Sequence, residues 1–489
     1  MKRPAPMWVL IVSIILGGCA VGPNHRPPES DLPSRFNEAL TNGATSHGGD
    51  LSAWWLSFRD QGLNRLIARV VKSNRDLLIA EARVREARAL RGVVSARLWP
   101  TADGSAAYTR VRSSENGLLG QAATRGLLPL ETDLYDVALD AVWELDIFGG
   151  TRRTVEAAEA EIGAAQESGR DVLVTLLAEA GLNYIELRGL QKELAVTRAN
   201  LKAQKQTLEL TRDRVRAGLA TELDVTRAAA QMSTTAAEIP ELETGIKRTI
   251  HRLCVLAGVA PATLAGQLMQ AVPIPQRPPD VPVGLPSELL RRRPDVRRAE
   301  RQLAAATARI GAVTADLFPR FFLTGAVGLQ SVSASDLLTG GSRFWSLGPS
   351  IQWPIFNAGG IRQNIRVQNA RQEQAVLAYE QTVLISLEEV ENALISYSKA
   401  QLRFRQLAKA EQANRRAVDL AHDRYRSGLV DFLDVLEAER SLYTAQAKLV
   451  QSERSASQNL VRLYKALGGG WKPEPTRATP PYNPNRQRS

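Results

Sequence analysis

The chain has 489 residues, of which 44% are hydrophobic and 23% charged, which excludes a disordered protein and is ample for a core. The formal net charge of +11 would suit a nucleic-acid-binding protein. However, the basic residues are spread through predicted helices with acidic residues beside them, so we expect no nucleic-acid partner. Aromatic residues make up only 6%, while Ala, Leu, Arg, Glu and Gln fill long tracts, a composition typical of long helices and coiled coils.

The N-terminus has the features of an export signal. Two basic residues precede an apolar run from Met7 to Leu16, which is too short to span a bilayer because spanning takes about 20 residues. A secretory signal cleaved near a chance cysteine is one interpretation. The small residues before Cys19 favour another, a lipoprotein signal peptide over residues 1–18 whose removal leaves Cys19 carrying a covalent lipid. Ala20 follows the cysteine, and by resemblance to Gram-negative lipoproteins this favours the outer membrane.

Both ends of the mature chain are predicted to lack regular structure. Residues 19–54 contain several prolines with scattered Gly, Asn and Ser, which indicates an anchored, extended segment. Residues 468–489 are predicted to be a disordered tail. Cys254 is the only other cysteine, so we expect no internal disulfide and a buried helix position for Cys254.

The first structured part, residues 55–258, begins with a predicted helix from Trp55 to Trp99. Two segments with a period of two follow. In the stretch DLYDVALDAVWELD, apolar residues alternate with acidic ones, from Tyr135 to Leu145. This alternation predicts a strand with one apolar face and one polar face.

A long helix is predicted next, from Gly150 to about Arg216, which would be roughly 100 Å at 1.5 Å per residue. A shorter helix follows from about Thr221 to Ala257, and Pro240 within it predicts a bend because it removes a backbone hydrogen bond. Leucines recur every seven residues along the long helix, which predicts coiled-coil packing. These leucines are Leu187, Leu194, Leu201 and Leu208.

A Pro-rich linker over residues 259–285 separates two copies of one pattern. The stretch RPDVRRAERQLAAATARIGAVTADLFP resembles NRDLLIAEARVREARALRGVVSARLWP, with Asp295 opposite Asp76. We therefore predict that residues 286–467 repeat the order of residues 55–258, which is helix, two strands, long helix, turn and helix.

The turn between the two helices is also repeated. GLVDFLDVLEAER starts at Gly428 and resembles GLATELDVTRAAA, which starts at Gly218. Because glycine can take the left-handed backbone that ends a helix, both stretches are predicted to be helix-hairpin turns. Thr221 with Asp224, and Asp431 with Asp434, have the cap-to-N3 spacing that opens the next helix. Asp434 and Glu437 also share one helix face, so capping and an acidic functional site both remain open here.

Four predicted strands cannot close a barrel, and strands with one apolar face in an exported protein require lipid. The chain must therefore associate, with eight strands for two copies and twelve for three. Asp and Ser on the polar faces fit an aqueous lumen and favour the wider barrel. The predicted fold class is mainly α with a membrane β-barrel, an internal tandem repeat and long coiled-coil helices that form a tunnel.

The sequence resembles the TolC-type outer-membrane efflux proteins, in particular the NodT-like lipoprotein subfamily. The resemblance covers most of residues 19–467. It implies a homotrimer with a twelve-stranded barrel, four strands from each chain, above a periplasmic α-barrel tunnel of twelve helices. It also implies docking to a periplasmic adaptor (membrane fusion) protein and an inner-membrane pump, commonly of the RND class. The matching stretches are CAVGPNHRPP, LPSELLRRRPDVRRAE, FPRFFLTGAVGL, WPIFNAGG and RYRSGLVDFLDVLEAERSLY.

The resemblance also assigns roles to single residues. Asp434 and Glu437 match the acidic ring at the periplasmic aperture of the tunnel. Tyr425 matches the tyrosine that ties the inner helix pair to the outer pair, and Asp224 matches its acidic partner. Val430 stands where some relatives place an arginine that reinforces the closed state, which implies a closed aperture held by fewer or different polar links.

We expect a passive trimeric duct of a tripartite efflux system, which exports small molecules such as drugs across the Gram-negative outer membrane. Alternatives are the outer-membrane duct of a type I protein secretion system and a lipid-anchored structural coiled-coil protein of the periplasm. An enzyme is not expected, because the sequence has no phosphate loop or nucleophile motif. Neither a metal site nor any cofactor besides the lipid on Cys19 is expected, since the four histidines are far apart in the sequence. They are His25, His47, His251 and His422.

Overall fold

The computed structural model describes residues 20–28, 32–38, 40–41, 44–117, 121–123, 125–126, 129–278 and 281–472. The predicted signal peptide, Cys19 and residues 473–489 of the predicted tail lie outside the described residues. The chain forms two compact units, each assembled from separated stretches. Unit 1 comprises the N-terminal stretch to Pro28, Val84–Ala165 and Ala299–Tyr379, and unit 2 comprises Glu29–Arg83, Gln166–Arg298 and the chain from Glu380 onward.

Helices with both the length and the hydropathy needed to traverse a bilayer are absent from the described part of the chain.

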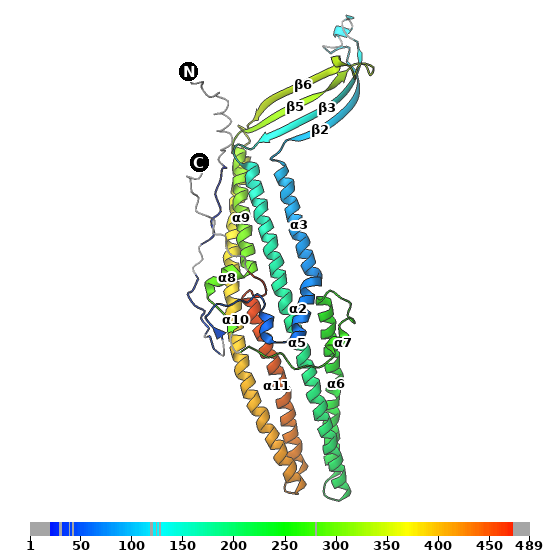
Figure 1. Ribbon diagram of the computed structural model, residues 1–489, viewed down its shortest axis with the longest axis vertical. Coiled ribbons are helices and arrows are strands. Elements are labelled where there is room, and N and C mark those ends of the chain that lie inside the picture. Colours follow the sequence, from blue (N-terminus) through cyan, green and yellow to red (C-terminus); the bar gives the residue numbers. More distant parts are fainter. Residues whose placement is uncertain are drawn as a thin grey trace. The chain divides into compact units, whose positions relative to one another are not determined.

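Unit 1 contains one four-stranded sheet, in which every neighbouring pair of strands is antiparallel (Figure 1). Its order is β2-β3-β5-β6, so the two strands of each repeat lie side by side and β3 joins β5 across the repeats. Both pairs of strands come from the segments whose alternation predicted strands. The bounds are β2 Thr101–Arg112, β3 Glu131–Leu145, β5 Arg320–Ser331 and β6 Arg343–Gln352.

The register of the sheet collects apolar side chains on one face. Leu139 lies opposite Val327, which lies opposite Trp345, and these side chains are 60%, 56% and 79% exposed. Polar residues occupy the other face, where the Gln330 amide donates a 3.1 Å hydrogen bond to the Asp136 carboxylate. Because side chains alternate along a strand, a shift of one residue would exchange the two faces. The apolar alternation of each strand is therefore in register with that of its neighbours.

The two edge strands of this sheet, β2 and β6, each pair with one strand within the described residues. Each therefore has a row of backbone N–H and C=O groups without a ladder partner. A sheet of this kind, with one exposed apolar face, does not complete itself within one chain.

The junctions that lead from helix to strand are built alike in the two repeats. The indole N–H of Trp143 donates a 3.0 Å hydrogen bond to the carbonyl of Leu98, at the end of the helix before β2. Trp353 donates in the same way to Leu317 over 3.1 Å. Leu98 and Leu317 occupy the same position in the two stretches that resemble each other, so the repeat predicted from the sequence is present in the contacts.

The N-terminal segment of unit 1 is extended, as predicted, and is held by specific contacts. The Val21 amide donates to the Phe148 carbonyl over 3.1 Å. The buried Arg153 donates to the Val21 carbonyl and to the Asn24 side chain over 3.1 and 2.7 Å. The chain that follows Cys19 is thereby fixed onto unit 1.

Unit 2 contains two helix hairpins and the shorter elements around them (Figure 1). One hairpin joins α5 to α6 and the other joins α10 to α11. Four helices belong to both units, namely α3 Arg75–Ala96, α5 Gly150–Arg216, α9 Pro294–Thr314 and α10 Gly360–Arg426. The helices of unit 2 alone are η1 Trp54–Phe58, α2 Gln61–Ser73, α6 Glu222–Leu256, α7 Ala265–Leu268, α8 Pro286–Arg292 and α11 Phe432–Ala466.

The main hydrophobic core lies in unit 2 and takes side chains from all of its long helices. Of the leucines whose spacing predicted coiled-coil packing, Leu187, Leu194 and Leu208 are buried, and Leu201 is half-buried. Cys254 is fully buried, as predicted, and its thiol donates to the Pro261 carbonyl. The helix α6 continues through Pro240.

The prediction of a single helix from Trp55 to Trp99 is wrong, because the helix is interrupted at Asn74, between α2 and α3. The Asn74 backbone is extended, and its side-chain oxygen accepts hydrogen bonds from the first amides of α3. Its side-chain nitrogen donates to the Leu256 carbonyl over 2.9 Å. A tertiary contact at the end of α6 therefore decides where α3 begins.

Arg293 performs the equivalent task in the second repeat, where it separates α8 from α9. It is buried and donates to the carbonyl of Ala466 over 3.1 Å, at the end of α11. It also forms ion pairs of 2.6 Å with Asp295 and with Glu389. The RRRPD stretch, which carries much of the family resemblance, is thus a structural joint.

Two further features were not predicted. A short parallel pair of strands is formed by β1, Ala44–Thr45, and β4, Val281–Pro282. It joins the N-terminal segment to the linker. The disordered tail predicted from residue 468 is wrong for its first residues, because Trp471 is buried. Its indole donates a 3.0 Å hydrogen bond to the Arg292 carbonyl, and the Arg170 guanidinium lies 4.7 Å from its ring.

Replacing Arg293 with Met tests the joint. The Arg293→Met variant leaves the partly buried Asp295 without its cation, so the free energy of unfolding should fall by about 3 kcal/mol, measured as thermal unfolding in detergent. Arg298→Met is the matched control, because its ion pair with Asp171 is half-exposed and should contribute less than about 1 kcal/mol. Equal losses in the two variants would contradict the assignment.

The pH dependence of this loss follows from Asp295. Burial alone would raise the pKa of Asp295, but hydrogen bonds and the charge of Arg293 outweigh it and hold the pKa below its usual value. Stabilisation by such a carboxylate is present above its unfolded pKa of about 4 and disappears as the pH falls through the lower native pKa. The difference between wild type and Arg293→Met should shrink over that acidic range.

Candidate functional site

The two helix-hairpin turns of unit 2 have the same backbone geometry. Gly218 and Gly428 both have φ of 73°. The amide of the next residue in each turn donates a hydrogen bond to a carbonyl of the preceding helix. Leu219 donates to Arg214 over 2.8 Å, and Leu429 donates to Arg424 over 2.9 Å. This is the glycine-terminated cap that the sequence suggested. A Cβ at either glycine would meet no atom within 4 Å, so the positive φ is the only local constraint.

The acidic residues that follow the two turns are used differently. In the first repeat, one Asp224 carboxylate oxygen accepts from the Thr221 amide over 3.1 Å and from the Thr221 hydroxyl over 2.8 Å. Asp224 thus stabilises the start of α6 as part of a capping box. The capping interpretation accounts for its contacts in this conformation.

In the second repeat, the carboxylates are left exposed. The side chain of Asp431, at the start of α11, makes no capping hydrogen bond. Asp434 and Glu437 are exposed on α11, and neither carboxylate joins a side-chain hydrogen bond or ion pair with another residue in the described ranges. Two positions with the same sequence spacing have diverged, and only Asp224 serves a cap.

Tyr425 links the two helix hairpins, although not through Asp224. The Arg214 guanidinium lies 4.4 Å from the centre of the Tyr425 ring and donates to the Tyr425 carbonyl over 3.0 Å. Burial raises the pKa of the Tyr425 hydroxyl. Within the described part of the chain, that hydroxyl forms no hydrogen bond with Asp224. The contact between α5 and α10 in this conformation therefore runs through Arg214.

Apolar packing surrounds Tyr425. Its ring centre lies 5.9 Å from that of Phe432, and Leu208 and Val435 belong to the same buried cluster. Val430 packs against this cluster. Val430 thus contributes an apolar contact at this turn.

A further link was missed by the sequence reasoning. Glu439 on α11 is buried and accepts a 2.9 Å hydrogen bond from the Thr207 hydroxyl of α5. The same oxygen lies 3.0 Å from the His422 ring on α10. Three helices meet at this carboxylate. A glutamate in an amphipathic helix rich in charges gives no sequence signal of burial, so no pattern could have found it.

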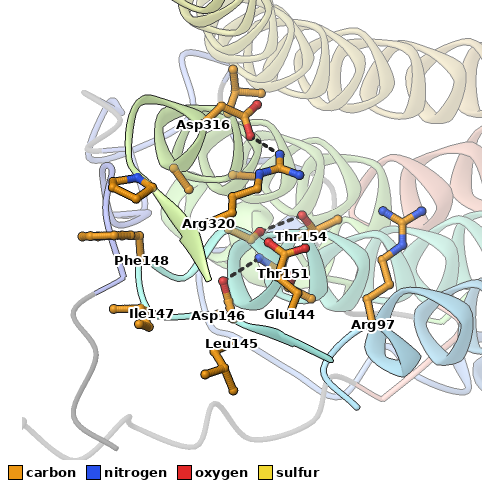
Figure 2. A pocket seen from close by; sticks show the side chains of 15 residues that line it. Arg97, Glu144, Leu145, Asp146, Ile147, Phe148, Thr151, Thr154, Asp316 and Arg320 are labelled. Carbon is orange, nitrogen blue, oxygen red and sulfur yellow. Dashed lines mark hydrogen bonds and ion pairs between the residues drawn. The ribbon is translucent and has the colours of Figure 1, made fainter. Parts of the chain in front are cut away.

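Unit 1 has a polar cavity of about 280 Å³ at the helix–strand junctions (Figure 2). Asp146 accepts from the amide of Thr151 at the start of α5, and Asp316 pairs with Arg320. Figure 2 shows these acids turned toward their local partners, with Arg97 in the turn that follows α3. The acids therefore stabilise the junctions, and this cavity is not the candidate site.

Together, an open sheet with one apolar face and two capped helix hairpins define a channel protein of the TolC type. The sequence matches the outer membrane efflux protein family over residues 66–259 and 285–469. The chain belongs to that family, which confirms the resemblance found in the sequence.

Curated relatives extend over nearly the whole chain. Nodulation protein T of Rhizobium leguminosarum bv. trifolii is 32% identical, over 94% of this chain and 96% of that protein. The toluene efflux pump outer membrane protein TtgI of Pseudomonas putida is 31% identical, over 96% and 98%. The probable outer membrane lipoprotein SilC of Salmonella typhimurium is 31% identical, over 94% and 97%.

Solved structures have the same fold. The outer-membrane channel OprN is 37% identical with a TM-score of 0.85, over 93% of this chain and 100% of that one. The open state of the MtrE outer membrane channel of Neisseria gonorrhoeae is 27% identical with a TM-score of 0.76, over 93% and 99%. The predicted fold class is confirmed at the level of a single chain.

The turn geometry predicts the effect of one substitution. Gly428→Val forces a β-branched residue into a positive φ, which should cost more than about 1 kcal/mol and lower the yield of folded protein in the outer membrane. Gly428→Asn is the control, since asparagine tolerates this conformation and should lose much less. Wild-type yield and wild-type efflux from the valine variant would show that the turn does not need the left-handed backbone.

Proposed function

We propose that three copies of this chain form a passive duct through the outer membrane, as part of a tripartite efflux system. The observation that carries the proposal is the sheet of unit 1, with its exposed apolar face and two unpaired edges. In lipid, every backbone polar group needs a partner, so such strands are stable only in a closed barrel. Pairing β2 of one copy with β6 of the next supplies the missing partners.

Three copies suit the chemistry of the sheet better than two. The face opposite the apolar one contains Asp136, Asp140 and Gln330. These side chains would line the lumen, and eight strands leave only enough room for side chains. Twelve strands provide an aqueous passage. No catalytic step is required of the duct, whose energy would come from its pump.

The lipid on Cys19 would serve as a second attachment to the membrane. The described chain begins with residues that Arg153 and Phe148 fix onto unit 1, so an acylated Cys19 would be tethered close to that unit. A relative whose name includes outer membrane lipoprotein supports this arrangement. The helix hairpins would extend into the periplasm.

The partners proposed are a periplasmic adaptor and an inner-membrane pump of the RND class. The helix-hairpin turns are the surface proposed for the adaptor. Relatives carry names that refer to toluene and solvent efflux pumps, which supports small toxic molecules as the cargo class. A duct selects little, and the pump would make most of the choice.

The aperture is proposed to be ringed by Asp434 and Glu437. Three copies would place six carboxylates around one narrow axis. Their exposure, and their freedom from ion pairs within the described residues, support this role. Unit charges several Å apart in partly desolvated surroundings repel by kcal-scale energies, which salt reduces over a Debye length of about 8 Å. Such a ring attracts cations and binds multivalent cations tightly enough to obstruct passage.

Neutralising the ring tests the proposal. The Asp434→Asn, Glu437→Gln double variant should lose its cation preference and its block by multivalent cations in single-channel recordings, with the trimer intact. Glu222→Gln, which removes an exposed acid from α6, is the control and should keep both properties. A neutralised channel that remains cation-selective and blocked would show that these residues are only helix starts.

Tyr425 and Asp224 share no hydrogen bond among the described residues, and we propose that they meet in the closed state of the aperture, which should give them a different signature. Tyr425→Phe combined with Asp224→Ala should raise conductance by loosening the closed state and leave ion preference nearly unchanged. If these residues only stabilise the fold, thermal stability should fall by about 1 kcal/mol for the lost cap, with no electrical change.

A further inference from the structure

Unit 2 contains a cavity that neither the barrel nor the aperture explains. Its volume is about 730 Å³. The end of η1, the first turns of α2, one face of α5 and the segment around α7 form its walls. We call it the basic pocket, because four of its lining residues are arginines. They are Arg59, Arg65, Arg69 and Arg188, and the other charged lining residue is Asp60.

The charge of the basic pocket is unbalanced. Arg59, Arg65 and Arg69 are exposed, and within the described residues none of their guanidinium groups forms an ion pair. Asp60 offsets only one of these charges, and its carboxylate accepts hydrogen bonds from the Leu63 amide over 2.8 Å and from the Tyr184 hydroxyl over 2.9 Å. Four cations against one anion leave a formal charge of +3 on the lining.

Arg188 gives an independent indication that an anion belongs here. Only 3% of this residue is exposed. Its terminal nitrogens donate to the Gln191 side-chain oxygen over 2.7 Å, to the Leu268 and Gln270 carbonyls over 3.3 and 2.8 Å, and to the Tyr184 hydroxyl over 3.2 Å. The guanidinium also lies 4.6 Å from the centre of the Tyr184 ring. These acceptors are neutral, and among the residues that the structure describes its Nε has no hydrogen-bond partner. A buried guanidinium without a counter-anion carries a large desolvation cost, which an anion in the pocket would offset.

The backbone adds a third element. The pocket is lined by Gln61 and Gly62, the first two residues of α2. Amides at these positions precede the intrahelical hydrogen bonds, and a helix N-terminus attracts anions. A Cβ on Gly62 would lie 2.4 Å from the Tyr184 hydroxyl, so the close approach of helix and ring requires glycine. Burial raises the pKa of Tyr184 to about 12, so its hydroxyl stays protonated and keeps its hydrogen bond to Asp60.

The size of the pocket indicates more than a single inorganic ion. Cavities of about 300 to 1,000 Å³ hold whole small molecules. Leu66, Leu264 and Leu268 provide apolar wall beside the guanidinium groups. Guanidinium groups bind carboxylates and phosphates through paired hydrogen bonds, and Arg65 and Arg69 share one face of α2 at a spacing of four residues.

We propose that the basic pocket binds a small organic polyanion that carries two or three carboxylate or phosphate groups. The charge number matches the excess of cations on the lining, and the apolar wall accommodates the carbon skeleton between the anionic groups. This site is separate from the proposed aperture of acids, and its occupancy does not depend on the duct being open.

Calorimetry on the purified full-length protein in nonionic detergent tests the site, with citrate and pyrophosphate as probes and acetate as the singly charged reference. Citrate or pyrophosphate should bind at least tenfold more tightly than acetate. Citrate as the tighter ligand identifies carboxylates as the natural group, and pyrophosphate identifies phosphates. The Arg65→Gln, Arg69→Gln variant should bind at least tenfold more weakly, while the Arg403→Gln, Arg405→Gln control on exposed arginines of α10 should be unchanged.

A second pair of variants leaves the arginines in place. Ala68 is exposed and lines the pocket, so Ala68→Glu would supply a tethered carboxylate and should compete with citrate, whereas Ala68→Gln should not. Absence of saturable binding, equal affinity for acetate and citrate, or equal losses in the two arginine variants would each overturn the proposal. None of these results depends on the conductance of the channel, so the proposed duct and the proposed binding site are tested independently.

Discussion

The unpaired edges of the four-stranded sheet constrain everything else in this protein. Strands β2 and β6 each leave a row of backbone groups without partners, and the strands between them present an apolar face. Lipid can accept the apolar face but not the open edges. Both demands are met when copies of the chain join edge to edge. Under the proposed function, association is therefore a condition of membrane insertion.

The two repeats stabilise the fold through equivalent contacts. Both repeats use a tryptophan to close the junction before the strands, with Trp143 and Trp353 donating to equivalent carbonyls. Both repeats also tie the entry of a helix to the end of another, through Asn74 and Arg293. Where the repeats differ, a residue that stabilises the fold in one repeat has no such contact in the other. Asp224 caps its helix, and its counterpart Asp434 is left exposed.

Features encoded by local sequence were predictable. The period of two gave the strands and their apolar face, the heptads gave the buried leucines of α5, and glycine gave the two left-handed turns. The resemblance to a known family gave the class of protein. In each case neighbouring residues along the chain contain the information, because backbone geometry alone determines which side chains share a face.

Features decided by tertiary contacts were not predictable. The break at Asn74 depends on the distant Leu256 carbonyl, and a helical pattern ran through it in the sequence. The burial of Glu439 depends on Thr207 and His422, which come from two other helices. Trp471 lay in a Gly- and Pro-rich tail, yet it packs between arginines. The basic pocket likewise joins segments that are far apart in the sequence.

Cross-linking across the sheet edges tests the central claim most directly. Ser105 on β2 and Ser346 on β6 lie on the polar face, at opposite edges of the sheet. Two strands separate them, roughly 14 Å at about 4.8 Å per strand, which is too far for a disulfide within one chain. With Ser105→Cys fixed and a second cysteine scanned along that face of β6, at least one pair should give oxidised species of two and three chains and none larger. Cross-linked species of two chains at most, or of more than three chains, would contradict a closed twelve-stranded barrel.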